Sequence, residues 1–266
     1  MNSSNRFAVV TGASSGIGYE LARVFAKNGY DLLVTAENSD LTNAVHDLKR
    51  VGTEVQSIQA DLASYEGVEK LWQAIQSTGR PIDAIAINAG VGVGGNFIET
   101  DLQEELNLIQ LNVTSTVHLA KYVVKEMVSR GSGRILFTSS IAGTMPTPLE
   151  AVYGASKAFV LSFSQSLRYE LKDTGVSVTA LQPGPTDTNF FRRAGMEDTK
   201  VGSEGKHTND PAEVAQQGYE ALMSGKDHIY ASSLKTKIQG ELGKFVPESI
   251  KAEQHRKQAE PKSGTR

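Results

Sequence analysis

The stretch TGASSGIG at residues 11–18 follows an apolar run at 7–11 and opens an amphipathic segment at 17–28. Its three glycines allow a tight turn, a close approach of the backbone to a bound group, and close packing of a helix on a strand. The N–H groups at the start of that helix would point toward a phosphate. The stretch therefore predicts a strand, a phosphate-binding turn and a helix. The residues expected to contact the bound group are Gly12, Ser14, Ser15, Gly16, Ile17 and Gly18.

The spacing of these glycines, Gly-x3-Gly-x-Gly, differs from the general dinucleotide fingerprint Gly-x-Gly-x2-Gly. A glycine-rich turn without a ligand is the alternative interpretation. The position between a strand and a helix favours dinucleotide binding, because the pyrophosphate lies at this position in such folds.

The rest of the chain alternates short apolar runs with longer amphipathic segments. Strands are expected at 7–11, 31–35, 55–59, 83–87, 133–138, 176–181 and 228–231, and helices at 17–28, 41–50, 65–77, 102–130 and 152–172. The strands are apolar on both faces, which is typical of a parallel sheet covered by helices on both sides. We therefore expect a single α/β domain with a doubly wound, Rossmann-like sheet in three α/β/α layers.

Two regions depart from this alternation. The segment 185–210 is long for a connection and carries several glycines and aromatic side chains, so it is either a mobile substrate flap or a loosely packed surface excursion. The tail at 234–266 is polar and is expected to be helical, docking on the core or on another subunit. We expect a catalytic domain over 1–233 and this tail after it. The apolar tail residues at helical spacing are Leu234, Ile238, Leu242, Phe245 and Val246.

Composition narrows the class of function. The 266 residues include no cysteine and five scattered histidines, which excludes disulfides and a cysteine nucleophile and predicts no metal site. A net charge of −3 gives no reason to expect a nucleic-acid partner. No stretch approaches the roughly 20 apolar residues that cross a bilayer, and the polar start of the chain does not resemble a secretory signal. We expect a cytoplasmic protein that acts on small molecules, without a membrane partner.

Further cofactor residues are expected where the next strands end. Glu37, after the second strand, can accept hydrogen bonds from the adenine-side ribose and would repel a 2′-phosphate, which favours NAD over NADP. Alternatively, its side chain points to water. Asp61, followed by Leu62, would meet the adenine ring or else cap the next helix. The fourth strand ends at the narrow backbone of Asn88, Ala89 and Gly90.

A catalytic pair is expected on the helix at 152–172. Tyr153 and Lys157 are four residues apart, so both lie on one helix face. A neighbouring ammonium lowers the pKa of a phenol from about 10, which would make Tyr153 a usable proton donor and acceptor. Taken alone, such a pair is often a solvated surface. Ser140, just past the fifth strand, would add a hydroxyl at the same crevice, although the adjacent Ser139 is also a candidate and either serine could merely satisfy a turn.

Together these residues resemble the short-chain dehydrogenase/reductase family over about residues 6–190. The matching pieces, in the order that the family shows, are Thr11-Gly12-x3-Gly16-x-Gly18, Asp61, Asn88-Ala89-Gly90, Asn112, Ser140, Tyr153-x3-Lys157 and Pro183-Gly184. The interval from Ser140 to Tyr153 is typical of the family and selects Ser140 over Ser139. The resemblance implies an oxidoreductase that moves a hydride between a nicotinamide and an alcohol/carbonyl pair.

The resemblance also implies a role for each residue. Tyr153 would exchange a proton with the substrate oxygen, and Ser140 would hold and polarise that oxygen. Lys157 would bind the nicotinamide ribose and lower the pKa of Tyr153. Asn112 would hold a water molecule that links Lys157 to solvent. The turn at 183–188 would hold the nicotinamide carboxamide, and its residues expected at the cofactor are Pro183, Gly184, Thr186 and Thr188.

The resemblance bears on the cofactor and on assembly as well. Many relatives that use NADP carry a basic residue where Glu37 or Ser15 stands, and neither position is basic here. NAD is therefore the expected cofactor. Relatives commonly form dimers or tetramers through their two long helices, so a homodimer or homotetramer is expected.

Two other functions compete with this enzyme. A regulator that binds NAD(P) on the same fold without turnover would not need the set of Asn112, Ser140, Tyr153 and Lys157. A nucleotide-sugar epimerase or dehydratase would have a longer substrate domain and a Gly-x2-Gly-x2-Gly loop, neither of which is present. The substrate pocket is expected to be lined by 92–97, 144–151 and 185–210, whose composition suits a neutral, moderately apolar molecule.

Overall fold

The computed structural model describes residues 6–202, 209–231 and 246–262. The strands are β1 (Arg6–Thr11), β2 (Tyr30–Ala36), β3 (Val55–Gln59), β4 (Ala84–Ile87), β5 (Gly133–Thr138), β6 (Val176–Pro183) and β7 (His228–Ala231). The helices are α1 (Gly16–Lys27), α2 (Asp40–Lys49), α3 (Tyr65–Ser77), α4 (Leu102–Ile109), α5 (Ser115–Arg130), α6 (Ala151–Glu170), α7 (Phe190–Arg193), α9 (Pro211–Met223) and α11 (Glu248–Ala259). A π-helical turn, η1 (Gln110–Thr114), and a 3-10 turn, η2 (Ile141–Thr144), complete the order.

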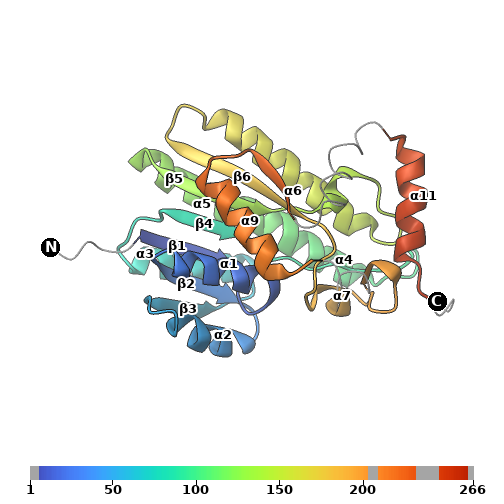
Figure 1. The fold of residues 1–266 in the computed structure, drawn as a ribbon, viewed down its shortest axis with the longest axis horizontal. Coiled ribbons are helices and arrows are strands. Elements are labelled where there is room, and N and C mark those ends of the chain that lie inside the picture. The colour runs from blue at the N-terminus through green and yellow to red at the C-terminus, as the bar shows by residue number, and fades with distance from the viewer. Residues whose placement is uncertain (1–5, 203–208, 232–245, 263–266) are drawn as a thin grey trace.

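The seven described strands form one sheet in the order β3-β2-β1-β4-β5-β6-β7, and every pairing is parallel. Successive side chains of β1 point to opposite faces: Ala8 packs in one apolar cluster and Val9 in the other. Helices α1, α2 and α9 cover the first face, whereas α3, α5 and α6 cover the second (Figure 1). The expected doubly wound, three-layer α/β/α fold is therefore confirmed.

The strand order reverses direction at β1, which pairs with β2 on one side and β4 on the other. In such sheets the ligand crevice opens at this point, beyond the carboxyl ends of the strands. Thr11 joins the two strand ends, because its hydroxyl accepts hydrogen bonds from the backbone N–H groups of Asn88 and Ala89 at 2.9 and 3.0 Å. The glycine-rich loop and the residues after β4 are thus held side by side.

The helix expected over 102–130 is interrupted. It consists of α4 and α5 with the π-helical turn η1 between them, which contains Asn112. The side chain of Asn112 bonds both the N–H and the carbonyl of Val91, at 3.0 and 2.9 Å. A π-helical turn holds one more residue than an α-helical turn and is frequent at functional sites. The amphipathic pattern does not reveal it, because apolar spacing continues on both sides.

Helix α9 was not among the expected helices, although its start is marked in the sequence. The carboxylate of Asp210 accepts a hydrogen bond from the backbone N–H of Ala212 at 2.8 Å, and Pro211 follows this cap directly. The helix packs on α1 and completes the first face of the sheet. Each helix in the described parts of the chain is too short or too polar to cross a membrane.

The described part of the tail docks on the chain itself. Helix α11 brings Ala259 into a small apolar cluster with Ala194, Met196 and Val201 of the 185–210 segment. The backbone N–H of Lys262 donates to the carbonyl of Asp198 at 2.8 Å. The apolar residues expected to dock at 234–245 lie outside the described residues. The division of the chain into 1–233 and 234–266 stays a prediction.

Candidate active site

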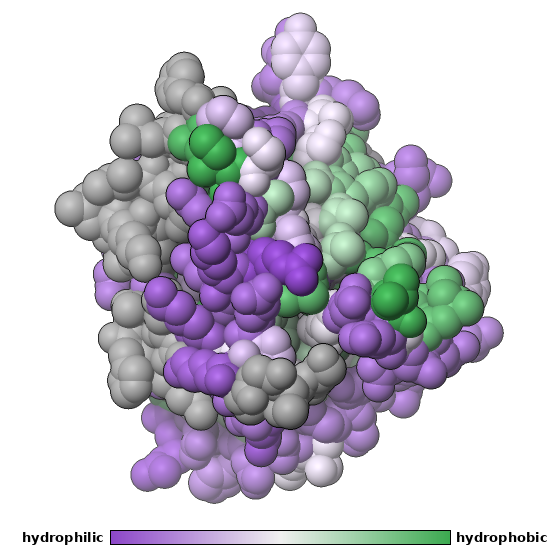
Figure 2. All heavy atoms as spheres, turned by 90° about the vertical axis from the view of Figure 1, so that its right-hand side faces the viewer, coloured by the Kyte–Doolittle hydropathy of each residue, from purple (hydrophilic) through white to green (hydrophobic). Residues whose placement is uncertain are grey.

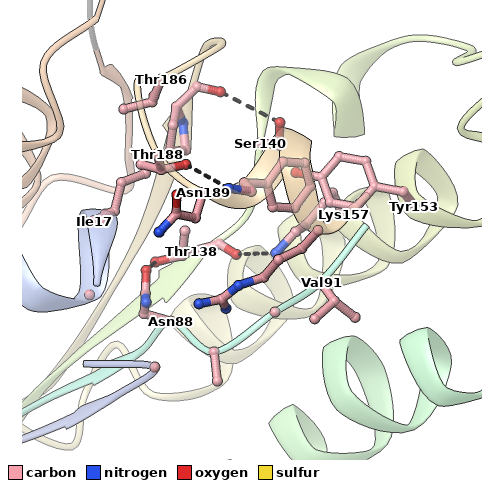
Figure 3. A pocket seen from close by; sticks show the side chains of 18 of the residues that line it. Ile17, Asn88, Val91, Thr138, Ser140, Tyr153, Lys157, Thr186, Thr188 and Asn189 are labelled. Carbon is pink, nitrogen blue, oxygen red and sulfur yellow. Dashed lines mark hydrogen bonds between the residues drawn. The ribbon is translucent and has the colours of Figure 1, made fainter. Parts of the chain in front are cut away.

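One cavity opens at the carboxyl end of the sheet. Its lining includes every residue that the sequence assigns to the cofactor, together with Ser140. Figure 3 shows Ser140, Lys157 and Tyr153 around one part of this cavity, with Ile17 and Thr188 across from them. Asn112 is not part of the lining. The structure therefore brings the two expected groups, cofactor residues and catalytic residues, into one continuous space.

The glycine-rich loop has the shape that a dinucleotide needs. Gly12 and Gly16 have φ values of +69° and +58°, which favour glycine. A Cβ on Gly16 would lie 2.9 Å from the methyl carbon of Thr188, and a Cβ on Gly18 would overlap the carbonyl oxygen of Gly12. Ser15 stands at the N-cap of α1 but makes no side-chain capping bond. The first N–H groups of α1 are thus left for an anion, so the loop fits a pyrophosphate.

The adenine side of the cavity is lined by Glu37, Asp61 and Leu62. The side chain of Glu37 is exposed. Asp61 serves the turn before α3, since its carboxylate accepts a hydrogen bond from the N–H of Ala63 at 2.9 Å. The cap of α3 itself is Ser64, which accepts from Gly67 at 3.0 Å. The alternative that Asp61 caps the helix is therefore wrong, because the cap lies three residues later. The position of Asp61 in the cavity lining is compatible with an adenine contact.

The side chain of Asn88 is occupied with holding strand ends together. It donates to the carbonyl of Thr11 at 3.1 Å. It also accepts from the hydroxyl of Thr138 at 3.0 Å (Figure 3). A Cβ on Gly90, two residues later, would be tightly packed at 3.1 Å from both the Nζ of Lys157 and the Oδ1 of Asn112, so these side chains would have to shift. These residues thus bring narrow backbone to the cavity wall, as the sequence indicates.

The two serines after β5 point in different directions. The hydroxyl of Ser139 donates to the backbone carbonyl of Lys157 at 2.7 Å and ties β5 to α6. Ser140 lines the cavity, and its hydroxyl bonds that of Tyr153. The same oxygen accepts from the N–H of Ala142 at 3.1 Å. Geometry thus favours Ser140 over Ser139 as the hydroxyl that meets a substrate.

Lys157 is buried one turn after Tyr153. Its Nζ donates to the carbonyl of Thr138 at 3.0 Å and lies 5.7 Å from the centre of the Tyr153 ring. Burial disfavours the ammonium and lowers the pKa of Lys157 to about 8. The lysine is therefore a cation at neutral pH that releases its proton only slightly above it.

The expected lowering of the Tyr153 pKa by Lys157 is wrong for this structure. The pKa of Tyr153 is raised above its ordinary value, first by burial and then by the negative charge of Glu150, and only the bond with Ser140 acts in the opposite direction. The physical reason is that burial disfavours the phenolate more than its neighbours favour it. Tyr153 is accordingly a protonated acid over the neutral range.

Asn112 is placed differently from the expected water ligand. Its amide nitrogen donates to Val91 and, at 3.0 Å, to the hydroxyl of Ser156, while its Oδ1 accepts from Val91. The side chain joins η1, α6 and the segment after β4. A water held by Asn112 would bond the second lone pair of Oδ1 or the backbone carbonyl, which also accepts from the hydroxyl of Thr116 at 2.9 Å.

The segment after β6 forms the opposite wall. Thr186 is buried and donates to the carbonyl of Gly184 at 2.8 Å, and the hydroxyl of Thr188 accepts from the N–H of Phe190 at 3.2 Å. The ring of Phe190 lies 5.1 Å from that of Tyr153. Phe191, Arg193 and Val201 also line the cavity, so this part of 185–210 belongs to the site rather than to a separate surface excursion.

The segment 92–97 supports that wall instead of lining the cavity. A Cβ on Gly92 would lie 2.6 Å from the ring of Phe190, and the N–H of Gly94 donates to the carbonyl of Ala194 at 2.9 Å. Gly95 likewise donates to the carbonyl of Leu149 at 2.8 Å. From the other expected segment, 144–151, Met145 and Glu150 do line the cavity.

Helix α11 contributes residues that sequence reasoning missed. His255 and Gln258 line the same cavity as Tyr153. The Nε2 of His255 lies 3.1 Å from the Oε2 of Glu150, and these side chains are only 9% and 4% exposed. No local pattern marks His255, since its partner is more than 100 residues away. The pair joins the tail to the N-cap residue of α6.

Comparisons with known proteins agree with this site. A family model described as short chain dehydrogenase matches residues 6–198. Oxidoreductase UcpA of Salmonella typhimurium is 29% identical over 259 residues, which cover 93% of this chain and 97% of UcpA. A short-chain dehydrogenase from Sphingobium yanoikuyae in complex with NADPH is 30% identical with a TM-score of 0.78, covering 85% of this chain and 87% of its own.

A second solved structure is the bulky-bulky ketone specific alcohol dehydrogenase from Comamonas testosteroni. It is 26% identical with a TM-score of 0.77, covering 91% of this chain and 92% of its own. The family model spans well over half of the 266 residues, and the family's serine, tyrosine and lysine meet in one cavity. The chain is therefore an oxidoreductase of the short-chain dehydrogenase family.

Proposed function

We propose that this chain interconverts a secondary alcohol and a ketone, or a primary alcohol and an aldehyde, using a nicotinamide dinucleotide. The observation that supports this most is the continuity of the cavity, which runs from the glycine-rich loop to Ser140, Tyr153 and Lys157. A pure dinucleotide sensor has no need of a proton donor at the end of that cavity. The relatives that match are oxidoreductases, which also favours the enzyme over the silent regulator.

The chain's own residues would handle the oxygen and its proton. Ser140 would hold the substrate oxygen through its hydroxyl, next to the Tyr153 hydroxyl that it already bonds. In reduction Tyr153 would donate its proton to that oxygen, and in oxidation it would accept the alcohol proton. The raised pKa of Tyr153 keeps it in the protonated form that reduction requires. Lys157 would hold the cofactor ribose and, with its pKa of about 8, can exchange protons near neutral pH.

The bound nicotinamide would supply the hydride for reduction or accept it in oxidation. In the oxidative direction the alcohol carbon loses a hydride and its oxygen loses a proton, so a carbonyl compound, a reduced nicotinamide and one proton result. The loop around Gly12, Gly16 and Gly18 would hold the pyrophosphate, and Thr186 or Thr188 the carboxamide.

We propose a neutral, moderately apolar substrate. Met145, Phe190, Phe191 and Val201 add apolar side chains to the cavity lining, and Phe190 packs on Tyr153, while the paired Glu150 and His255 add one polar position. Purified protein should be screened against alcohols and ketones of increasing apolar size with both cofactors. Turnover of any of these compounds supports the proposal. Dinucleotide binding without turnover of any of them would favour the regulator.

NAD is the proposed cofactor, and Glu37 is the reason. Its carboxylate lines the cavity beside Asp61 and would repel a 2′-phosphate while accepting hydrogen bonds from the ribose. The Sphingobium relative is in complex with NADPH, so that relative accommodates the phosphorylated dinucleotide. Fluorescence titration should show NADH binding more tightly than NADPH, and Glu37→Ala should narrow the difference by about fivefold, as expected for one exposed charge. Tighter binding of NADPH to the wild type would contradict the proposal.

The pH dependence should respond to Glu150. Alcohol oxidation needs a deprotonated Tyr153, so its rate should increase with pH below the raised pKa of that group. The charge of Glu150 raises this pKa, and Glu150→Gln should therefore give a faster oxidation at a given alkaline pH, which corresponds to a profile shifted to lower pH. Lys157 and Ser140 also face Tyr153, and His255 faces Glu150, but glutamine can still bond a histidine. Rate profiles over the alkaline range measure the shift.

Glu170→Gln is the matched control, because Glu170 ends the same helix and is exposed. Its profile should coincide with that of the wild type. Coincident profiles for Glu150→Gln as well would show that the carboxylate of Glu150 has no influence on Tyr153.

We also propose a cytoplasmic homodimer or homotetramer formed through the long helices. Leu102, Leu106 and Ile109 are exposed along one side of α4, and Phe159 is exposed on α6. Figure 2 shows the end of the molecule where α7 and α11 lie, with apolar side chains gathered on one side of a mostly polar surface. The mass in solution, measured by light scattering, tests this assembly.

A further inference from the structure

Arg193 reaches from the segment after β6 to the glycine-rich loop. Its Nη2 donates to the hydroxyl of Ser15 at 3.4 Å, although the two residues are 178 positions apart in the chain. Ser15 is the N-cap of α1 and does not bond its own helix. The guanidinium therefore lies next to the uncapped N–H groups that would receive a phosphate.

Among the described residues, no carboxylate pairs with the charge of Arg193. Within the described residues no ion pair includes Arg193, whereas Arg23, Arg80, Arg130 and Arg256 each have one. Arg193 lines the cavity, as do Ser15 and Glu37. The loop itself, TGASSGIG, has no basic residue. Arg193 is thus a cation that the tertiary structure adds to a loop without one.

The helix that carries Arg193 also touches the catalytic residues. The ring of Phe190, at the start of α7, packs on Tyr153 with 5.1 Å between ring centres. The N–H of Ala194 donates to the carbonyl of Phe190 at 2.9 Å, so the helical turn that carries Arg193 is hydrogen-bonded to Phe190. Thr188, just before α7, leaves no room for a side chain on Gly16. A ligand bound by Arg193 would therefore fix the position of α7 and keep the Phe190 ring packed on Tyr153.

We propose that Arg193 is a phosphate ligand of the dinucleotide and that this contact fastens helix α7 over the cavity. The inference rests on the proposed function, since it needs a dinucleotide at the glycine-rich loop. A planar guanidinium suits phosphate oxygens, because it offers paired donors together with a fixed charge. The phosphate is either the pyrophosphate, which NADH and NADPH share, or the 2′-phosphate of NADPH.

Titration of NADH and NADPH into the wild type, Arg193→Ala and Arg192→Ala tests the proposal. Dissociation constants should be measured by fluorescence at low ionic strength, because salt screens an exposed charge. Arg193→Ala should weaken binding about tenfold, as expected for one charge-assisted hydrogen bond. Equal weakening of both dinucleotides assigns the pyrophosphate, and weakening of NADPH alone assigns the 2′-phosphate. Arg192 is the neighbour on α7 and does not line the main cavity, so Arg192→Ala should bind like the wild type.

Hydrogen exchange of the backbone amides at 188–196 gives a second readout. Saturating NADH should slow this exchange in the wild type and in Arg192→Ala, and should slow it less in Arg193→Ala. Arg193 is exposed, so its replacement leaves the core intact. If the wild type binds dinucleotide, and Arg193→Ala has the same dissociation constants and the same slowing of exchange as the wild type, the role of Arg193 is overturned while the proposed function stands. A wild type that binds neither dinucleotide would instead overturn the proposed function, and this inference with it.

Discussion

Tyr153→Phe should lower the turnover number by about a thousandfold, within the range that loss of a positioned acid/base causes. The variant removes one hydroxyl, which bonds Ser140 and would exchange the proton with the substrate oxygen. It keeps the ring, which packs on Phe190 and lies beside Lys157. Folding and dinucleotide affinity should therefore remain those of the wild type. Steady-state kinetics with the best substrate from the screen, together with NADH titration, separates the two effects.

Tyr169→Phe is the matched control for this experiment. Tyr169 lies on the same helix, α6, but is 72% exposed and far from the cavity. The same chemical change there should leave turnover unaltered. Turnover by Tyr153→Phe at the wild-type rate would remove Tyr153 from the reaction and require another proton donor.

Gly18→Ala should damage both stability and cofactor binding. The added Cβ would overlap the carbonyl oxygen of Gly12 and lie 2.5 Å from the side-chain nitrogen of Asn88. The neighbour is backbone and cannot rotate away, so α1 or the loop must shift. Overpacking of this kind costs about 1–3 kcal/mol of unfolding free energy. Because the same shift displaces the loop that would hold the pyrophosphate, NADH affinity should fall at least about tenfold. Urea unfolding and NADH titration measure the two losses.

Gly218→Ala provides the comparison, since Gly218 is also a buried helical glycine that packs on the sheet. A Cβ there would lie 3.1 Å from the side chain of Leu181, which can adjust. Alanine also favours a helix interior over glycine by about 1 kcal/mol. The unfolding midpoint of this variant should stay close to that of the wild type. If Gly18→Ala unfolds and binds NADH as Gly218→Ala does, the close approach at Gly18 has no consequence.

Much of the site follows from local sequence. The TGASSGIG stretch predicts the loop between β1 and α1. The short apolar runs between amphipathic segments predict all seven strands within a few residues. The carboxyl ends of strands in a parallel sheet share one edge, so the sequence predicts that Glu37, Asn88 and Ser140 lie at one crevice, and all three line the same cavity. The spacing of Tyr153 and Lys157 places both on one helix face.

Other features depend on which distant elements pack together. The π-helical turn contains Asn112, whose side chain bonds Val91. The raised pKa of Tyr153 arises from burial and from Glu150. Considered alone, Lys157, four residues after Tyr153 on the same helix, predicts a lowered pKa of Tyr153 instead of a raised one. Local spacing conveys which charges are neighbours on one helix, but not how much water the fold removes from them.

The sequence by itself determined the seven strands, most of the helices, the glycine-rich loop and the spacing of Ser140, Tyr153 and Lys157. These depend on repeats of two to four residues and on motif spacing, which the chain carries locally. Only the tertiary structure decided that Arg193 meets Ser15 and that His255 of α11 meets Glu150 at the cavity. Such contacts join residues more than 100 positions apart, and no periodicity encodes them, because they arise when separately formed elements bury their surfaces against each other.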